Sequence, residues 1–212
     1  MSAVKRRTYT SLQRTRQAEA TRGRILDAAL VLFVEDGYAA TTIDVIASRA
    51  GVAVPTVYKA FRTKRAILER LVESVMSGEP GARNLADQEW FHEQLDEPDP
   101  GRQLALIARN ARRIYDRAGP LLRVVREAAT SDTDIAALWK QISTSRRRRS
   151  GVTAKNLRSK RGRLRHQTEM VVDILWTQTA PELWDILVRE ARWTPDRYER
   201  WLADALVAML VT

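Results

Sequence analysis

Residue types that could perform covalent or metal chemistry are scarce in this sequence. The chain has no cysteine, which excludes disulfides, cysteine-ligated zinc and a thiol nucleophile. Its two histidines, His92 and His166, are far apart in the sequence, and no His–carboxylate metal spacing accompanies them. A Gly-rich phosphate loop and a nucleophile elbow are also missing. We therefore expect neither an enzyme nor a metal or other cofactor.

The chain is strongly basic, with a formal net charge of +10 over 212 residues. Residues 1–77 hold 13 Lys or Arg against 7 Asp or Glu, so the excess is denser there than in the remainder, which holds 23 against 19. Such a surface attracts nucleic acid, an anionic membrane or an acidic protein. No apolar run is long enough to span a membrane, and the N-terminus lacks the apolar core of a secretory signal. We expect a cytoplasmic protein.

One short stretch could present its polar side chains to a partner. Residues 41–61 read TTIDVIASRAGVAVPTVYKAF, two short helices broken at Gly51. Val54, Val57 and Phe61 give the second helix an inner face, and Pro55 suits its first turn. A short helix that is held by two others on one side leaves its other side free to enter a DNA major groove. The stretch therefore favours a helix-turn-helix DNA-binding unit.

Flanking elements must hold this stretch in place. A helix whose apolar face begins at Ile25 should end at Gly37 in a left-handed conformation. Thr41 is the expected cap of the second helix, with Asp44 as the capping-box acid, and Thr63 the expected cap of a fourth. The fourth helix fades at Ser77–Gly81, the best domain boundary. We expect a basic flexible arm with a helical extension near its end at 1–20, the DNA-binding domain at 21–77, and a second domain at 78–212, where the bulky side chains suit a large pocket or a partner surface.

The larger domain shows only helical periodicity, so the fold class expected is all-α. Apolar faces recur from Leu104 to Tyr115, and "GP" at 119–120 should restart a new helix. Further helices are expected around 135–142, 170–175, 183–187 and 198–209. The apolar stripe lapses through STSRRRRSG at 143–151, which indicates an exposed or kinked segment rather than a pocket wall.

The segment Arg22–Glu73 resembles the DNA-binding domain of the TetR/AcrR family of transcriptional regulators. The residues that carry this resemblance are Ile25, Ala28, Ala29, Phe33, Gly37, Tyr38, Thr41, Thr42, Ile46, Ala47, Ala50, Gly51, Val52, Thr56, Tyr58, Phe61, Lys64 and Leu68. The tail from Val172 to Leu210 is more loosely similar to a C-terminal domain common in actinobacterial members. The resemblance covers about a quarter of the chain densely.

The family resemblance implies a homodimeric, all-helical regulator, in most cases a repressor, on a palindromic operator of double-stranded DNA. It implies that four residues touch phosphates or position the recognition helix: Thr42, Thr56, Tyr58 and Lys64. It implies that four others lie at or near base edges: Ala53, Val54, Pro55 and Lys59. Val54 replaces a residue that is often small and polar, which leaves apolar contact there. Arg65 replaces a residue that is often acidic or small, which should strengthen attraction to the DNA backbone.

A small-molecule effector of unknown identity is expected to release the operator. Candidate lining residues for its pocket are Ile107, Ala111, Tyr115, Leu122, Val125, Trp139, Ile142 and Trp176, although core packing is open for each. Candidate dimerisation residues, which could instead be buried inside the monomer, are Leu183, Leu187, Trp201, Ala205 and Met209.

Several alternatives stay open from the sequence. The basic arm could reach along the DNA backbone or into a minor groove, or could be a disordered tail. Lys140–Arg165 holds 11 Lys or Arg and no acid, including the run at 146–149. That run could be a solvated helix face, or it could contact nucleic acid or an anionic ligand such as a coenzyme-A thioester. The rival classes are an enzyme, an architectural DNA binder and a membrane-surface protein.

Overall fold

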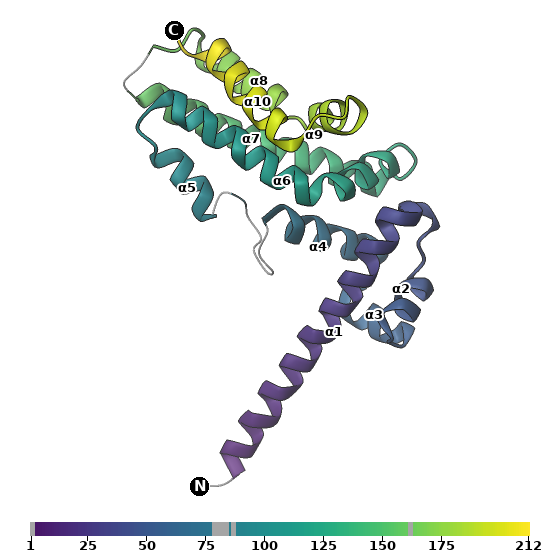
Figure 1. The fold of residues 1–212 in the computed structure, drawn as a ribbon. Helices are drawn as coiled ribbons and strands as arrows, with labels where there is room; N and C mark the ends of the chain where they lie inside the picture. Colours follow the sequence, from purple (N-terminus) through teal and green to yellow (C-terminus); the bar gives the residue numbers. More distant parts are fainter. Residues whose placement is uncertain (1–2, 78–84, 86–87, 161–162) are drawn as a thin grey trace. The chain divides into compact units, whose positions relative to one another are not determined.

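The computed structural model describes residues 3–77, 85, 88–160 and 163–212, with side chains at residue 13 and from residue 15 onward (Figure 1). The described chain is helical throughout and holds no β-strand, only an isolated antiparallel bridge between Leu164 and Val211. The expected all-α class is therefore confirmed. The chain divides into two compact units, which we call the N-terminal unit, residues 1–71, and the C-terminal unit, residues 72–212.

Four helices begin the chain, and the fourth continues across the division between the units. They are α1 (Ala3–Ala40), α2 (Ile43–Ala50), α3 (Val54–Phe61) and α4 (Lys64–Ser77). Their apolar faces meet in one small core, which includes the fully buried side chains of Ile25, Phe33, Ile46 and Ile67. Neither α2 nor α3 is long enough to be stable alone, so this shared core is what holds α3 in place.

The C-terminal unit is built around two long antiparallel neighbours and their covers. Its elements are α5 (Glu89–Asp96), α6 (Pro100–Ala128), α7 (Thr133–Ser159), α8 (Thr168–Gln178), α9 (Pro181–Trp184), the π-helical segment η2 (Asp185–Glu190) and α10 (Pro195–Leu210). Helix α6 packs against α5, α7, α9 and α10, and α8 packs against α7 and α10 (Figure 1). An aromatic cluster closes one end of this core, with the Trp184 and Tyr198 rings edge to face at 4.9 Å.

Helix boundaries differ from the sequence expectations at the N-terminus. Residues 3–20, where a flexible arm with a helical extension near its end was expected, form the first half of α1. No Gly or Pro occurs between residues 3 and 22 to interrupt the helix. Gly37 does break α1, as expected, with a positive φ of 80°; its ψ of 167° is extended rather than left-handed helical. Of the boundary expected at Ser77–Gly81, only Ser77 is among the described residues, and the rest lies outside them.

Two expected interruptions of the C-terminal unit are wrong. Helix α6 continues through Gly119 and Pro120, and α7 continues through the whole arginine run. Pro120 removes a single backbone N–H donor, and the residues before and after it in α6 stay buried. Gly119 permits close packing, because a Cβ atom there would lie 3.3 Å from the Trp184 indole nitrogen. Helix α5 has no counterpart among the expected helices.

Candidate functional site

The turn between α2 and α3 is set by two local devices. Thr42, with extended backbone angles, caps α2 by accepting a hydrogen bond from the Val45 amide at 3.2 Å. The expected cap, Thr41, is one residue too early: its buried hydroxyl instead donates to the Gly37 carbonyl at 2.8 Å. Gly51 ends α2 in the left-handed region at φ 64°. Its own amide and that of the following residue satisfy carbonyls of the last turn of α2.

Helix α3 is buried along one face and exposed along the other. Val57 is 1% exposed and fixes the inner face. On the outer side Tyr58 is 51% exposed, Lys59 is exposed and Thr56 is half-buried. Among the other residues expected near base edges, Ala53 and Pro55 are exposed and Val54 is half-buried. The structure thus gathers the expected residues of α3 on one accessible ridge of the N-terminal unit.

Lys64 lies where it can act as a structural clamp. Its ammonium donates to the Tyr38 carbonyl at 2.7 Å and the Thr41 carbonyl at 2.9 Å, and it lies 4.1 Å from the centre of the Tyr38 ring. These bonds tie the first turn of α4 to the junction of α1 and α2. Of the two roles that the family resemblance implies for Lys64, positioning is the one that this geometry supports.

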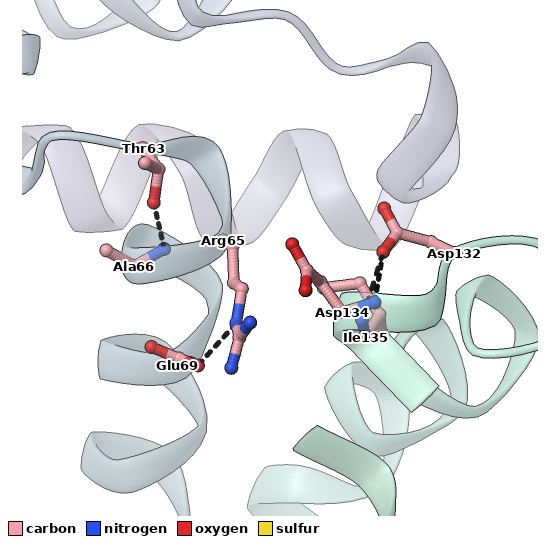
Figure 2. Close-up of polar contacts among 7 residues, drawn as sticks. All are labelled: Thr63, Arg65, Ala66, Glu69, Asp132, Asp134 and Ile135. Atoms are coloured by element: carbon pink, nitrogen blue, oxygen red, sulfur yellow. Dashed lines mark hydrogen bonds and ion pairs between the residues drawn. The ribbon is translucent and has the colours of Figure 1, made fainter. Parts of the chain in front are cut away.

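The start of α4 is capped as expected (Figure 2). The Thr63 hydroxyl accepts from the Ala66 amide at 3.0 Å. Arg65 pairs with Glu69 one turn later at 2.7 Å, so a carboxylate partly neutralises the cation that was expected to attract DNA. Figure 2 also shows the matching device in the C-terminal unit, where the Asp132 carboxylate caps α7 by accepting from the amides of Asp134 and Ile135.

The C-terminal unit contains two cavities that share one wall residue, Arg146. We call the first the amide cavity; it measures about 90 Å³ and is lined mainly by α5, α6 and α7. The second, the tryptophan cavity, measures about 310 Å³ and lies between α7, α8 and the start of α9, with Trp139, Ile142 and Trp176 in its wall. A pocket of about 300 Å³ is at the lower end of the range for small-molecule sites.

Polar groups converge inside the amide cavity. Asn110 donates to the Gln94 side-chain oxygen at 3.3 Å, and the Gln94 amide donates to the Thr153 hydroxyl at 3.4 Å. The Asn110 side-chain oxygen is buried and has no partner among the described residues. The Tyr115 hydroxyl donates to the Thr179 carbonyl at 2.5 Å, and burial raises its pKa to about 12. A few polar groups in an apolar wall are typical of a ligand site.

Two arginines of the run at 146–149 face this cavity, which corrects the expectation of an exposed segment. Arg146 and Arg149 line it, whereas Arg147 and Arg148 are exposed and Arg147 pairs with Asp173 at 2.7 Å. Desolvation lowers the pKa of Arg146 and lowers that of Arg149 to about 10. The Arg146 guanidinium donates to the Trp176 carbonyl and lies 5.4 Å from the centre of the Trp176 ring.

The expected pocket residues separate into three groups. Ile107, Ala111 and Tyr115 line the amide cavity, and Trp139, Ile142 and Trp176 line the tryptophan cavity. Leu122 and Val125 line neither and are buried in the core. Sequence reasoning missed Gln94, Asn110 and Thr153, and it named Arg146 and Arg149 only within a run that could contact an anionic ligand, not as a pocket wall. The signal that could have found the last three was the spacing of 146, 149 and 153, which places them on one face of a continuous helix.

The expected dimerisation residues are distributed over the last three elements. Leu183 belongs to α9, Leu187 to η2, and Trp201, Ala205 and Met209 to α10. Met209 is 39% exposed and the others are half-buried. Large apolar side chains that are exposed in the single chain also include Met170, Ile186 and Val207.

The described part of the chain shows neither a membrane-spanning helix nor a metal site. No described helix combines the length and apolar character that crossing a membrane requires. The described residues also contain no group of three or more His, Cys, Asp or Glu that could hold a metal ion.

Comparison with known proteins finds sequence relatives for the helix-turn-helix segment of the chain. Residues 25–71 match the sequence model described as "Bacterial regulatory proteins, tetR family". The HTH-type transcriptional activator FasR of Mycolicibacterium smegmatis is 44% identical over 61 residues, which are 27% of this chain and 28% of the relative. The chain therefore matches less than a third of that relative's length.

Solved structures extend the likeness to the whole fold. The transcriptional regulator FadR from Bacillus subtilis, in complex with stearoyl-CoA, has a TM-score of 0.68 at 16% identity, covering 88% of this chain and 97% of that one. NalD, the secondary repressor of the MexAB-OprM multidrug efflux pump in Pseudomonas aeruginosa, has a TM-score of 0.66 at 18% identity, covering 92% and 98%. The matched family and these relatives are regulators of transcription rather than enzymes, and residues 25–71 of this chain carry the sequence of the tetR family of regulatory proteins.

Proposed function

We propose that the protein is a homodimeric, ligand-responsive repressor that acts in the cytoplasm on a palindromic operator. The observation that carries the proposal is the outer ridge of α3, where Tyr58 and Lys59 are exposed beside the half-buried Thr56, on a helix that the buried Val57 fixes in place. An α-helix of this kind fits the major groove, where side chains meet base edges, while hydroxyl and ammonium groups contact phosphates.

Dimerisation supplies the second half-site in this proposal. One helix-turn-helix unit covers one half-site, and two units that are related by a two-fold axis read a palindrome with half-sites about one helical turn apart or a multiple of that. The exposed Met170, Val207 and Met209 of α8 and α10 support an apolar interface between copies. A monomer in light scattering at micromolar concentration would contradict this part of the proposal.

The two cavities of the C-terminal unit support a sensor role. A ligand that binds the DNA-incompetent arrangement more tightly shifts the population toward it and releases the operator. Binding of ligands by a fold of this kind has a precedent in the FadR complex, and repression has one in NalD. FasR is an activator, so the direction of control must be measured.

Footprinting with and without effector tests the proposal. On DNA upstream of its own and neighbouring genes, the dimer should protect a palindrome, bind less tightly as salt increases, and repress a reporter placed behind that palindrome. Binding spread evenly over all DNA would instead favour an architectural protein. Activation of the reporter would contradict repression, and unchanged operator affinity with every bound compound would contradict the sensor role.

A further inference from the structure

The strongest unexplained feature of the molecule is a pair of cations turned into the C-terminal unit. Arg146, Arg149 and Thr153 follow the spacing that aligns side chains along one helical face, and all three line the amide cavity. Their neighbours Arg147 and Arg148 point to solvent. Helix α7 therefore places half of its arginine run in the cavity wall, where a charge is most costly.

Arg149 is the less compensated of the two. Among the described residues no carboxylate forms an ion pair with it, and the charges that act on its pKa are those of Tyr115 and two further arginines. Burial holds its pKa at about 10, below the usual value for arginine. Arg146 has a carbonyl acceptor at Trp176 and the attraction of Glu182. A half-buried cation without a counter-charge favours the binding of an anion.

We propose that the effector is an organic monoanion, a carboxylate on a compact apolar or aromatic body, with Arg149 and Arg146 as its anion-binding pair. The proposal rests on the sensor function proposed above and names the ligand class of that same site. Guanidinium groups suit this task because their planar array of donors matches the two oxygens of a carboxylate.

The two cavities divide the ligand between them. The amide cavity, at about 90 Å³, is too small for a typical ligand body and holds the anionic group beside Arg149. The tryptophan cavity, at about 310 Å³, takes the apolar body against Trp139, Ile142 and Trp176. Arg146 lines both cavities, so the carboxylate and the body meet at its side chain.

Calorimetric titration of the full-length protein without DNA tests the ligand class. The probes are phenylacetate, 2-naphthylacetate and octanoate, each compared with its neutral amide. We expect at least one carboxylate to bind about tenfold or more tightly than its amide, because the charge-assisted bonds are lost in the amide. Equal binding of acid and amide, or no binding of any acid at millimolar concentration, overturns the proposal.

Two matched variants test the residue. Arg149→Met should abolish the preference for the acid over the amide and should leave the Tm of the unliganded protein unchanged or higher, because a buried charge is removed. Arg148→Met, which removes an exposed charge from the next position of the same helix, should change neither quantity. A retained acid preference in Arg149→Met contradicts the assignment. If that variant does not fold, Arg149→Lys keeps the charge, and a preference as strong as wild type contradicts the bidentate role.

A third variant tests where the body lies, and a DNA measurement separates the two proposals. Ile142→Trp should fill the tryptophan cavity and weaken the binding of every probe. Unchanged binding would contradict the placement of the apolar body in this cavity.

Operator affinity is then measured with the carboxylate that binds most tightly. If the protein binds the acid selectively and operator affinity stays unchanged, the ligand class is supported and the sensor function is contradicted. If a compound releases the operator and Arg149→Met still binds that compound as tightly as wild type, the sensor function is supported and the ligand class is contradicted.

Discussion

Helices α3 and α7 treat their charged and polar side chains in opposite ways. In α3 the apolar Val57 is buried while Tyr58 and Lys59 face outward, as the hydrophobic effect favours. In α7 two arginines face inward, at a cost in desolvation that lowers the pKa of both. The outward face of α3 suits a large polyanion that arrives from solvent. The inward charges of α7 suit a small anion that the protein encloses.

The contrast separates two ways in which a helix can prepare for an anion. Helix α3 needs a stable support and costs the fold little, because its functional groups stay hydrated. Helix α7 stores an unfavourable charge in the unliganded protein that a ligand can relieve. Removal of an outward side chain of α3 should therefore weaken DNA binding without changing stability, whereas removal of an inward arginine of α7 should weaken ligand binding while stability stays the same or rises.

The largest expected effect comes from removing the support of α3. Phe33 is fully buried among the first four helices, so Phe33→Ala should destabilise the N-terminal unit by about 3–5 kcal/mol. Operator binding should be lost while carboxylate binding by the C-terminal unit persists, as urea unfolding and calorimetry would show. Val34→Ala, at a 43% exposed neighbour, is the control and should change stability by less than about 0.5 kcal/mol. Loss of both binding activities in Phe33→Ala would contradict separate units.

The next effect is a pH dependence in the C-terminal unit. The unfolded chain releases the Tyr115 proton near pH 10, whereas the folded protein keeps it to about pH 12. The folded state therefore binds more protons in this window, and this contribution to stability is complete below pH 10 and lost as the pH rises to 12. It amounts to about 3 kcal/mol. Urea unfolding at pH 9 to 12 should show a weaker pH dependence for Tyr115→Phe than for wild type. The exposed Tyr58→Phe should behave as wild type, and equal curves for all three would refute the assignment.

A smaller effect distinguishes clamp from phosphate contact at Lys64. Lys64→Met removes a cation that donates to two carbonyls, so we expect a loss of about 2 kcal/mol in stability together with weaker operator binding. If Lys64 only positions α4, the salt dependence of binding should keep its slope. A slope reduced by about two, one for the Lys64 of each copy in the dimer, with stability unchanged, would instead identify Lys64 as a phosphate contact.

The smallest effects should come from the outer ridge of α3 itself. Tyr58→Ala should weaken binding to all operator sequences by about fivefold to tenfold and leave the Tm unchanged, because the side chain is half exposed. Lys59→Ala should weaken binding and also relax base preference, which a competition between operator variants would reveal. Equal affinities in both variants and wild type would remove α3 from the interface.

Features of the fold were predictable from the sequence where neighbouring residues alone determine them. The helix-turn-helix was predictable because Gly51, Pro55 and Val57 each carry a local signal of turn, helix start or buried face. The caps were less certain, since Thr41 and Thr42 carry the same hydroxyl, and the sequence does not distinguish the one that bonds back to Gly37 from the one that caps α2.

The C-terminal unit was harder to predict because its decisive signals are not local. Gly119 and Pro120 read as a break, whereas α6 continues through both, and Trp184, distant in the sequence, packs on that glycine. The arginine run reads as a solvated face, because burial of Arg149 goes against its usual preference for water. Such a departure from the local rule is expected where a fold serves a ligand.

Methylation interference on the upstream palindrome would decide whether α3 reads DNA in the major groove. Methyl groups at guanine N7 project into that groove alone, so modified guanines in each half-site should block binding by wild type. Lys59→Ala should lose sensitivity at one symmetric pair of positions. Binding that tolerates N7 methylation throughout both half-sites would contradict major-groove reading by α3.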